Sequence, residues 1–404
     1  PSDSEGRSWN LRTLVEGGDA ADLNRAILTD LENGAASVLI SGPVAVDAAK
    51  LAKALEGVAL ELAPVALDAG FDGVKASEAL AAVAKGSPRA QLSFHLDPVS
   101  AYARAGGAPS DFATILKDAA TKAAGWASTY PDAKLFLASG QVAHEAGASM
   151  GQELAFALSS AVAYVKALVE AGVSIEKALS SVTLGVAVDQ QYFDSLAKVR
   201  ALRLLWANVS KAFGHEVQAQ IEARSSRRML SARDPWPNML RLTAAGFAGS
   251  VGGADVVVLD AFTRAAGLPD DFARRQARNT QLILMEESNL GRVDDPASGS
   301  WYLDARTRDL AQVAWTEFQA IEAEGGVIHG LEGHVIQPRI ARAREFAEKA
   351  YQNGSAQIIG VTKFVDPDVR TVSVADEVPS VPSYGAFEAL TPVRIAAAFE
   401  EAGQ

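Results

Sequence analysis

The stretch DAADLNRAILTDLENGAASVLISGP, residues 19–43, decides the fold because it joins one helix directly to one strand. Asp19 is a suitable helix N-cap, and apolar side chains then recur at helical spacing as far as Gly34. The β-branched run SVLI follows at once and is closed by Gly42 and Pro43, which is typical of a short strand. We therefore predict a helix over 20–33 and a strand over 37–40.

The same alternation of strand and helix continues through most of the chain. Helical periodicity marks the segments between strand candidates, notably 145–171, 189–213, 236–251 and 272–289. Repeated strand-then-helix units predict an α/β fold with a parallel sheet, and eight strands favour a TIM-type (β/α)8 barrel over an open sheet. The eight strand candidates are SVLI (37–40), LELAPVAL (60–67), QLSFHLDP (91–98), KLFLASG (134–140), VTLGVAV (182–188), EVQAQIEAR (216–224), DVVVLDAF (255–262) and QIIGVTKF (357–364).

We predict three regions along the chain. Residues 1–34 form an N-terminal extension with one helix, and residues 35–365 form the barrel. Residues 366–404 are rich in Pro, Ser, Asp and Val without a sustained period, so we predict a linker and a C-terminal tail there. The final RIAAAFEEAGQ could begin another helix.

The composition narrows the range of partners and compartments. Hydrophobic residues make up 49% of the 404 positions, enough for a large core. The net charge of -12 repels the phosphate backbone, so we expect no nucleic acid partner. The chain has no cysteine, which excludes disulfides and thiolate chemistry and fits a cytoplasmic protein. We also expect no signal peptide and no membrane-spanning segment.

Two short motifs match catalytic patterns only in part. Ser149 stands in a G-x-S-x-G pattern, but it lies in the early part of a predicted helix rather than after a strand, so we expect an accidental match. His144 and Glu145 begin an H-E-x-x-H pattern that fails at Ala148. We predict no metal site.

The strand candidate 216–224 alternates strictly between apolar and polar residues. In a barrel its apolar face must meet the helices, so Glu222 and Arg224 point into the lumen together with the other polar residues, Glu216, Gln218 and Gln220. Buried charge is costly unless it is paired or contacts a ligand or water. The lumen therefore either holds a polar site or is plugged by Glu222 and Arg224, which pair with each other and with their neighbours.

Several long segments resemble the barrel domain of the methylmalonyl-CoA mutases. They include ARRQARNTQLILMEESNLGRVDDPASGSWYLDARTRDLAQVAWTEFQAIEAEGG (273–326), SGQVAHEAGASMGQELAFAL (139–158) and DPWPNMLRLTAAGFAGSVGG (234–253). The opening SWNLRTLVEGGDAADLNRAILTDLENGA (8–35) is most similar to the small, or beta, subunits of heterodimeric bacterial enzymes. The resemblance implies a barrel threaded by the pantetheine arm of an acyl-CoA, capped by a cobalamin domain that we expect to be absent from this chain. Adenosylcobalamin would supply the radical chemistry.

The residues that would act on substrate in that family are replaced here. A Tyr-His pair after the fourth predicted strand corresponds to Gln141 and Val142, and valine cannot donate a hydrogen bond. An arginine that contacts the CoA ester corresponds to Ser181. A His and a Gln on the next strand correspond to Glu222 and Arg224.

The positions on the adenosyl side are replaced as well. An Asn and a Glu near the adenosyl group correspond to Asp260 and Arg264. The N-terminal tyrosine and arginine that clamp substrate have no match, and the cobalamin-binding D-x-H-x-x-G pattern is absent. The resemblance therefore implies degenerate substrate and adenosyl positions and no catalytic residue.

We expect a catalytically silent small subunit of a heterodimeric methylmalonyl-CoA mutase. Its partner would be the catalytic large subunit, with adenosylcobalamin in the complex, no cofactor bound by this chain, and a homodimer as the alternative when the chain is isolated. Carboxylates in the lumen would also repel polyanionic acyl-CoA. Two other hypotheses stay open: a barrel subunit of a mutase for a different acyl-CoA, and a CoA-ester binding module without chemistry.

Overall fold

Eight parallel strands form the centre of the molecule. The computed structural model describes residues 9–375 and 382–400. The strands follow one another in chain order, and β1 pairs with both β2 and β8, which closes the barrel. The predicted TIM-type (β/α)8 barrel is therefore confirmed. The strands are β1 (Asn10–Glu16), β2 (Ser37–Ser41), β3 (Val65–Asp68), β4 (Leu92–Leu96), β5 (Lys134–Ser139), β6 (Val182–Val188), β7 (Gln220–Ser225) and β8 (Val256–Val258).

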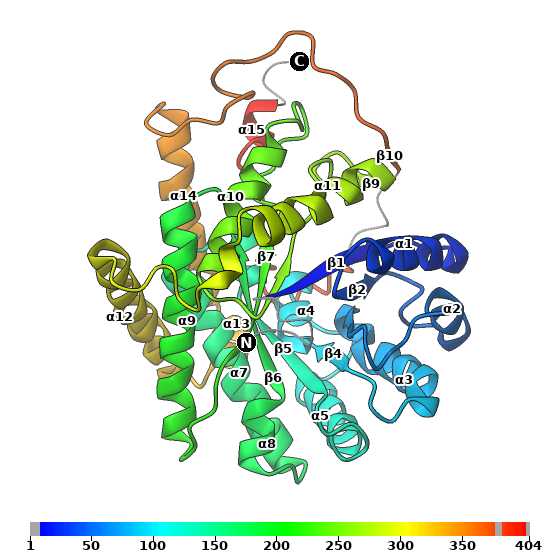
Figure 1. Cartoon of the computed structure of the whole chain (residues 1–404). Coiled ribbons are helices and arrows are strands. Elements are labelled where there is room, and N and C mark those ends of the chain that lie inside the picture. The colour runs from blue at the N-terminus through cyan, green and yellow to red at the C-terminus, as the bar shows by residue number, and fades with distance from the viewer. Residues whose placement is uncertain (1–8, 376–381, 401–404) are drawn as a thin grey trace.

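Helices surround the barrel on its outer side (Figure 1). A two-stranded antiparallel sheet of β9 (Leu268–Pro269) and β10 (Val374–Ala375) lies outside it. The helices are α1 (Ala20–Glu32), α2 (Ala48–Ala54), α3 (Gly73–Val83), α4 (Pro98–Ala105), α5 (Phe112–Thr129), α6 (Gln141–Glu145), α7 (Met150–Glu170), α8 (Ile175–Ser180), α9 (Tyr192–Ala212), α10 (Asn238–Val251), α11 (Asp271–Leu282), α12 (Trp301–Ala323), α13 (Val327–Glu332), α14 (Ile336–Gln352) and α15 (Ala397–Glu400).

The alternation of side chains along each strand separates two cores. Val38 and Ile40 of β2 point outward and belong to the large core between strands and helices. Leu39, between them, belongs to a separate small apolar cluster with Ala66, Val256 and Val258. Because successive residues of a strand point to opposite faces, this second cluster lines the inside of the barrel.

The first strand of the barrel lies where we predicted an extension. Residues 10–16 form β1, so the N-terminal region contributes a barrel strand as well as the helix α1. Leu11 and Val15 are buried against the helices, whereas Arg12 points into the barrel. A polar residue at an inward position interrupts the apolar run, and this hid the strand in the sequence.

The last strand candidate, QIIGVTKF (357–364), was wrong. These residues form turns with one isolated bridge between Ile359 and Lys363. Gly360 has φ +81° and Phe364 has φ +53°, and a strand requires negative φ at both positions. The predicted number of strands was right only because this error and the missed β1 cancel.

Several other predicted elements differ at their boundaries. The strand expected over 60–67 begins at Val65, the strand expected over 255–262 ends at Val258, and the helix expected over 272–289 ends as an α-helix at Leu282. The strand expected over 216–224 begins at Gln220, so Glu216 is exposed and does not face the lumen as we expected. The helix expected over 145–171 is divided into α6 and α7, since Gly147 adopts φ +105° between them. Ser149 then starts α7 as an N-cap, in a capping box with Gln152. This placement explains the accidental G-x-S-x-G match.

The C-terminal strap, residues 382–400, packs against loops and helices at the ends of strands β4, β5 and β7. Backbone amides of Ala386, Val393 and Ile395 donate to Gly106 O, Glu145 O and Arg228 O at 2.8, 2.8 and 3.0 Å. Phe387 is buried with its ring 4.8 Å from that of Tyr102. The described part of the segment predicted as a tail is thus attached to the barrel, and its end forms the short helix α15.

Among the described residues, α7 is the one helix long and apolar enough to cross a membrane, which we had not expected from the sequence. In this fold 72% of its apolar window is buried inside the protein. It contacts α12 on one side and strands β5 and β6 on the other. This environment is that of a core helix.

Candidate functional site

The inside of the barrel holds a charged cluster that we call the interior network: Arg12, Asp68, His95, Glu222 and Arg224. Glu222 on β7 accepts from two arginines, through Oε2 from Arg12 Nη1 at 2.5 Å and through Oε1 from Arg224 Nε at 2.6 Å. Arg224 Nη1 also donates to Asp68 Oδ2 at 2.6 Å. The predicted pairing of Glu222 with Arg224 and its neighbours is present. Arg12, Asp68 and His95 are members that the sequence did not reveal.

Water does not reach this network at the level of Glu222, whereas the Asp68 side chain is 47% exposed. Glu222 is 0% exposed, Arg12 4% and His95 5%. Although burial raises the pKa of Glu222, the positive charges of Arg224 and Arg12 and the nearby His95 lower it to about 2. The carboxylate therefore stays charged, and its two guanidinium partners satisfy it.

His95 completes the network in a strained backbone conformation. Its φ of +48° lies in the left-handed region, and the pairing of β4 with β5 shifts between Ser93 and Leu96. Burial lowers the pKa of His95, and the charges of Arg12 and Arg224 add to this shift while Glu222 opposes it, so that the pKa is about 3. Among the described residues its Nδ1 has no hydrogen-bond partner. The imidazole is therefore neutral and serves as filling.

Gln141 and Val142 lie beyond the end of β5, at the mouth of the barrel, where the carboxyl ends of the strands meet. Gln141 Nε2 donates to Ser225 O at 3.4 Å, across the mouth to β7. Val142 is buried in the large core rather than turned toward the mouth. Gln141 is thus near the interior network, whereas Val142 presents no group to a ligand.

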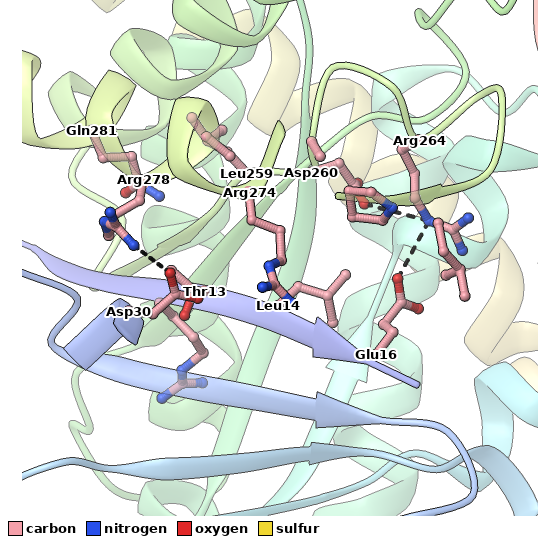
Figure 2. A pocket seen from close by; sticks show the side chains of 15 residues that line it. Thr13, Leu14, Glu16, Asp30, Leu259, Asp260, Arg264, Arg274, Arg278 and Gln281 are labelled. Atoms are coloured by element: carbon pink, nitrogen blue, oxygen red, sulfur yellow. Dashed lines mark hydrogen bonds and ion pairs between the residues drawn. The ribbon is translucent and has the colours of Figure 1, made fainter. Parts of the chain in front are cut away.

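Asp260 and Arg264 follow β8 at the same mouth. Asp260 Oδ1 accepts from Arg227 Nη2 at 3.0 Å, and Arg264 Nε lies 3.4 Å from Glu16 Oε2 and 4.0 Å from Asp260 Oδ1. Figure 2 shows Glu16, Asp260 and Arg264 beside a pocket of about 40 Å³ between β1, the loop after β8 and α11. On the other side of this pocket Arg278 pairs with Asp30. The charges at this rim are matched in pairs.

Ser181 lies away from the other predicted positions. It precedes β6, at the amino ends of the strands and so at the opposite end of the barrel from Gln141 and Asp260. It is fully buried, and its Oγ donates to Lys177 O at 2.6 Å in the last turn of α8. The structure therefore brings Gln141, Glu222, Arg224, Asp260 and Arg264 toward one mouth and leaves Ser181 out.

A second buried polar network lies between α6, α7 and α9. Glu153 accepts from Lys198 Nζ at 2.6 Å and from Ala187 N at 2.6 Å, and its Oε2 lies 3.2 Å from His144 Nδ1. His144 Nε2 is 2.7 Å from Ser226 Oγ. The order Ser226, His144, Glu153 is that of a hydrolytic triad. All of these side chains are buried, so the serine meets no substrate, and the network holds the helices to β6.

The histidines near these networks do not fit a cobalt ligand. Both ring nitrogens of His144 are within hydrogen-bond distance of Glu153 and Ser226, and His95 is enclosed by the interior network. The residues 9–375 and 382–400 contain no group of three His, Asp or Glu side chains placed to hold a metal ion. Neither histidine is free to coordinate the cobalt of cobalamin.

Comparison with known proteins gives the family. A family model described as methylmalonyl-CoA mutase matches residues 40–382. A methylmalonyl-CoA mutase small subunit from Streptomyces virginiae is 38% identical over 402 residues, covering 97% of this chain and 64% of the relative. A probable small subunit from Mycobacterium tuberculosis is 40% identical over 390 residues, covering 92% of this chain and 62% of the relative.

A third small subunit, from Propionibacterium freudenreichii subsp. shermanii, is 35% identical over 374 residues, which is 90% of this chain and 58% of the relative. The chain thus spans less than two thirds of the length of these three relatives. The family match nevertheless covers most of the chain and includes all barrel strands from β3 to β8. Together with the closed eight-stranded barrel, it shows that the chain belongs to the methylmalonyl-CoA mutase family.

Proposed function

We propose that this chain is the barrel part of a catalytically silent small subunit of a heterodimeric, adenosylcobalamin-dependent methylmalonyl-CoA mutase. Its task is to bind and stabilise a catalytic large subunit, and the cofactor acts on that partner. The same proposal places the chain in the cytoplasm, in keeping with its lack of cysteine. The relatives described above are named small subunits, which supports a role in an assembly.

The interior network is the observation that carries the proposal. In the family that this chain resembles, the pantetheine arm of the substrate runs along the barrel axis. Here Arg12, Glu222 and His95 lie inside the barrel and are almost inaccessible to water. A pantetheine chain could pass only if the two ion pairs of Glu222 were broken in a buried layer, which would leave charges without partners.

Side chains that fill the barrel, rather than a net negative charge, would keep an acyl-CoA out of it. We expected carboxylates in the lumen to repel acyl-CoA, but Glu216 is exposed outside the strand, and the charge of Glu222 is matched by Arg12 and Arg224. At the mouth, Asp260 pairs with Arg227 and Asp68 pairs with Arg224. A neutralised and tightly filled interior favours a structural role.

Two measurements test this proposal. Calorimetry with CoA, methylmalonyl-CoA and succinyl-CoA should show no micromolar binding to the isolated chain. Mixing the chain with a catalytic large subunit should give a stable complex that converts methylmalonyl-CoA with added adenosylcobalamin, and Gln141→Ala should leave the turnover of that complex unchanged. Binding of a CoA ester to the isolated chain, or loss of turnover in Gln141→Ala, would refute the silent role.

A further inference from the structure

A buried polar group lies between β1 and the two outer helices α1 and α11. We call it the outer polar site: Thr13 on β1, Asp30 on α1, and Arg274 and Arg278 on α11. Thr13 is 8% exposed, Asp30 3% and Arg278 5%. All four residues line the pocket of about 40 Å³ described above, and Figure 2 shows Asp30, Thr13 and Arg278 gathered at one end of it. These side chains therefore share one cavity.

Three of these side chains keep a polar atom without a hydrogen-bond partner among residues 9–375 and 382–400. The ion pair between Arg278 Nη1 and Asp30 Oδ1, at 2.5 Å, uses one atom of each residue. Arg278 Nε, Asp30 Oδ2 and Thr13 Oγ1 are left over, and all three atoms are buried. Because buried polar atoms in proteins are nearly always hydrogen-bonded, these atoms point to a small polar ligand in the pocket.

Arg274 gives the pocket a surplus of positive charge. Its side chain is 22% exposed and reaches from α11 toward β1 (Figure 2). Its ion-pair partner Asp271 is 96% exposed and does not line the pocket, so this pair contributes little. The other arginines of the pocket pair with carboxylates that are at most 17% exposed: Arg12 with Glu222, Arg264 with Glu16, and Arg278 with Asp30. An anion therefore complements the pocket.

Asp30 sets a further condition on that anion. A carboxylate oxygen accepts hydrogen bonds and donates none, so Asp30 Oδ2 would repel an anion that presents only acceptor oxygens. An oxyanion with a hydroxyl group avoids this repulsion, because its O–H donates to Asp30 Oδ2 while its other oxygens accept from Arg278 Nε, Thr13 Oγ1 and Arg274. A water molecule would satisfy the buried atoms but would leave the charge of Arg274 without a buried partner.

We propose that the outer polar site binds a small oxyanion that carries a hydroxyl group, such as hydrogen phosphate. The pocket has room for a few heavy atoms, since one water molecule needs about 10–15 Å³ of such space. A nucleotide or CoA is too large for it. Bound there, the anion would join α11 to α1 and β1 beside the seam where β8 pairs with β1. The site lies outside the interior network, so the inference does not depend on the proposed function.

Calorimetry with phosphate and with sulfate at neutral pH tests the proposal. Sulfate is also tetrahedral but has no hydroxyl at this pH, so phosphate should bind at least about tenfold more tightly. Thr13→Val and Arg274→Gln should each raise the Kd for phosphate about tenfold, because each removes a donor to a charged oxygen. Arg275→Gln is the matched control, since Arg275 is exposed on α11 and does not line the pocket, and it should leave this Kd unchanged.

Asp30→Asn tests the role of the hydroxyl. The amide that it introduces donates to sulfate, so the preference for phosphate over sulfate should fall at least about tenfold. Thermal unfolding without phosphate shows whether each variant folds like the wild type. If the broken ion pair unfolds Asp30→Asn, then Thr13→Val and Arg274→Gln decide. The proposal is overturned by a lack of saturable binding at millimolar phosphate, by equal binding of sulfate, or by phosphate binding that Thr13→Val and Arg274→Gln leave unchanged.

Discussion

Arg12 and Glu222 are 210 positions apart in the sequence, yet Arg12 Nη1 lies 2.5 Å from Glu222 Oε2 inside the barrel. Their strands, β1 and β7, are not neighbours, because β8 pairs with both. The ion pair therefore joins strands that share no backbone hydrogen bonds. It also connects the beginning of the barrel to its end.

Glu222→Gln should be more destabilising than Arg12→Met. Removing the carboxylate leaves Arg12 and Arg224 buried with their positive charges close together, and we expect a loss of about 3–5 kcal/mol in the free energy of unfolding. Arg12→Met leaves Glu222 paired with Arg224, so the loss should be smaller. Urea denaturation of the variants measures both.

The control for this comparison is Glu78→Gln. Glu78 pairs with Lys122 on the surface, where both side chains are about half exposed, and the loss should stay within about 1 kcal/mol. Equal losses in Glu222→Gln and Arg12→Met would contradict the shared role of the carboxylate.

His95 should make the protein less stable as the pH falls from about 6.5 toward 3. Its pKa is lowered to about 3 in the folded state, so the unfolded chain binds a proton in this range that the folded chain does not. Each pH unit in this window lowers the free energy of unfolding by about 1.4 kcal/mol. His95→Asn removes this dependence and tolerates the left-handed backbone. Denaturation of both proteins at pH 5 and pH 7 gives the difference.

Glu222 contributes in the same direction as His95, but only below its ordinary value of 4.5. Between pH 5 and 6.5 the difference between the wild type and His95→Asn therefore reports His95 alone, because every other group, including Asp97, contributes equally to both proteins. A wild-type protein and a His95→Asn variant with the same pH dependence there would show that the imidazole is protonated in the fold.

Asp97 should produce a pH dependence of the opposite sign. Burial raises its pKa to about 7, although Tyr164 Oη at 2.6 Å and the amide of Ser100 donate to its carboxyl group and oppose the shift. The folded chain then holds a proton that the unfolded chain has lost, so stability falls as the pH rises from 3.8 to about 7. In Asp97→Asn this fall should disappear. Carbon NMR of the Asp97 carboxyl group would detect the titration directly, and a midpoint near 4 would overturn the expectation.

Phe387→Ala should release the C-terminal strap without unfolding the barrel. The buried ring contacts Tyr102, and the amide of Phe387 donates to Gly106 O at 3.1 Å. Loss of a buried phenyl ring costs about 3–5 kcal/mol, here confined to the strap. Hydrogen exchange at Tyr384 and Ala386 should accelerate at least about tenfold. The exposed Phe346→Ala should change neither amide, and unaltered exchange in Phe387→Ala would count against a strap held by this ring.

The sequence allowed the barrel to be predicted because seven of its strands are compact apolar or alternating runs between helical segments. We did not predict the strand β1, because Arg12 and Thr13 interrupt its apolar pattern. Hydrophobic periodicity does not show that a charged residue such as Arg12 will form an ion pair with a residue far away in the sequence. The alternation of side chains along one strand was enough to place Glu222 and Arg224 inside the barrel. Predicting that Asp68 and His95 join them would have required the register between strands, and this register shifts near His95.

The other site positions were predicted from the family resemblance rather than from physical reasoning about the residues. Ser181 matched a family position without gaps, yet it lies at the opposite end of the barrel. Trp301, the first residue of α12, is 89% exposed. The sequence could not predict this, because an aromatic residue at the start of a helix can equally face a core. Only the packing of Leu303 inward fixes which side of α12 turns to solvent.

The pairing of β1 with β8 also orders events during synthesis. Residue 10 leaves the ribosome long before residue 256, its partner in the sheet. At about 5–20 residues per second the nascent chain spends on the order of tens of seconds with its first strand unpaired on one side. An unpaired edge invites association with other chains. A chain whose translation stops before β8 therefore cannot close the barrel and is left with an open, aggregation-prone sheet. We expect the need for chaperones to be greatest in the interval before β8 is synthesised.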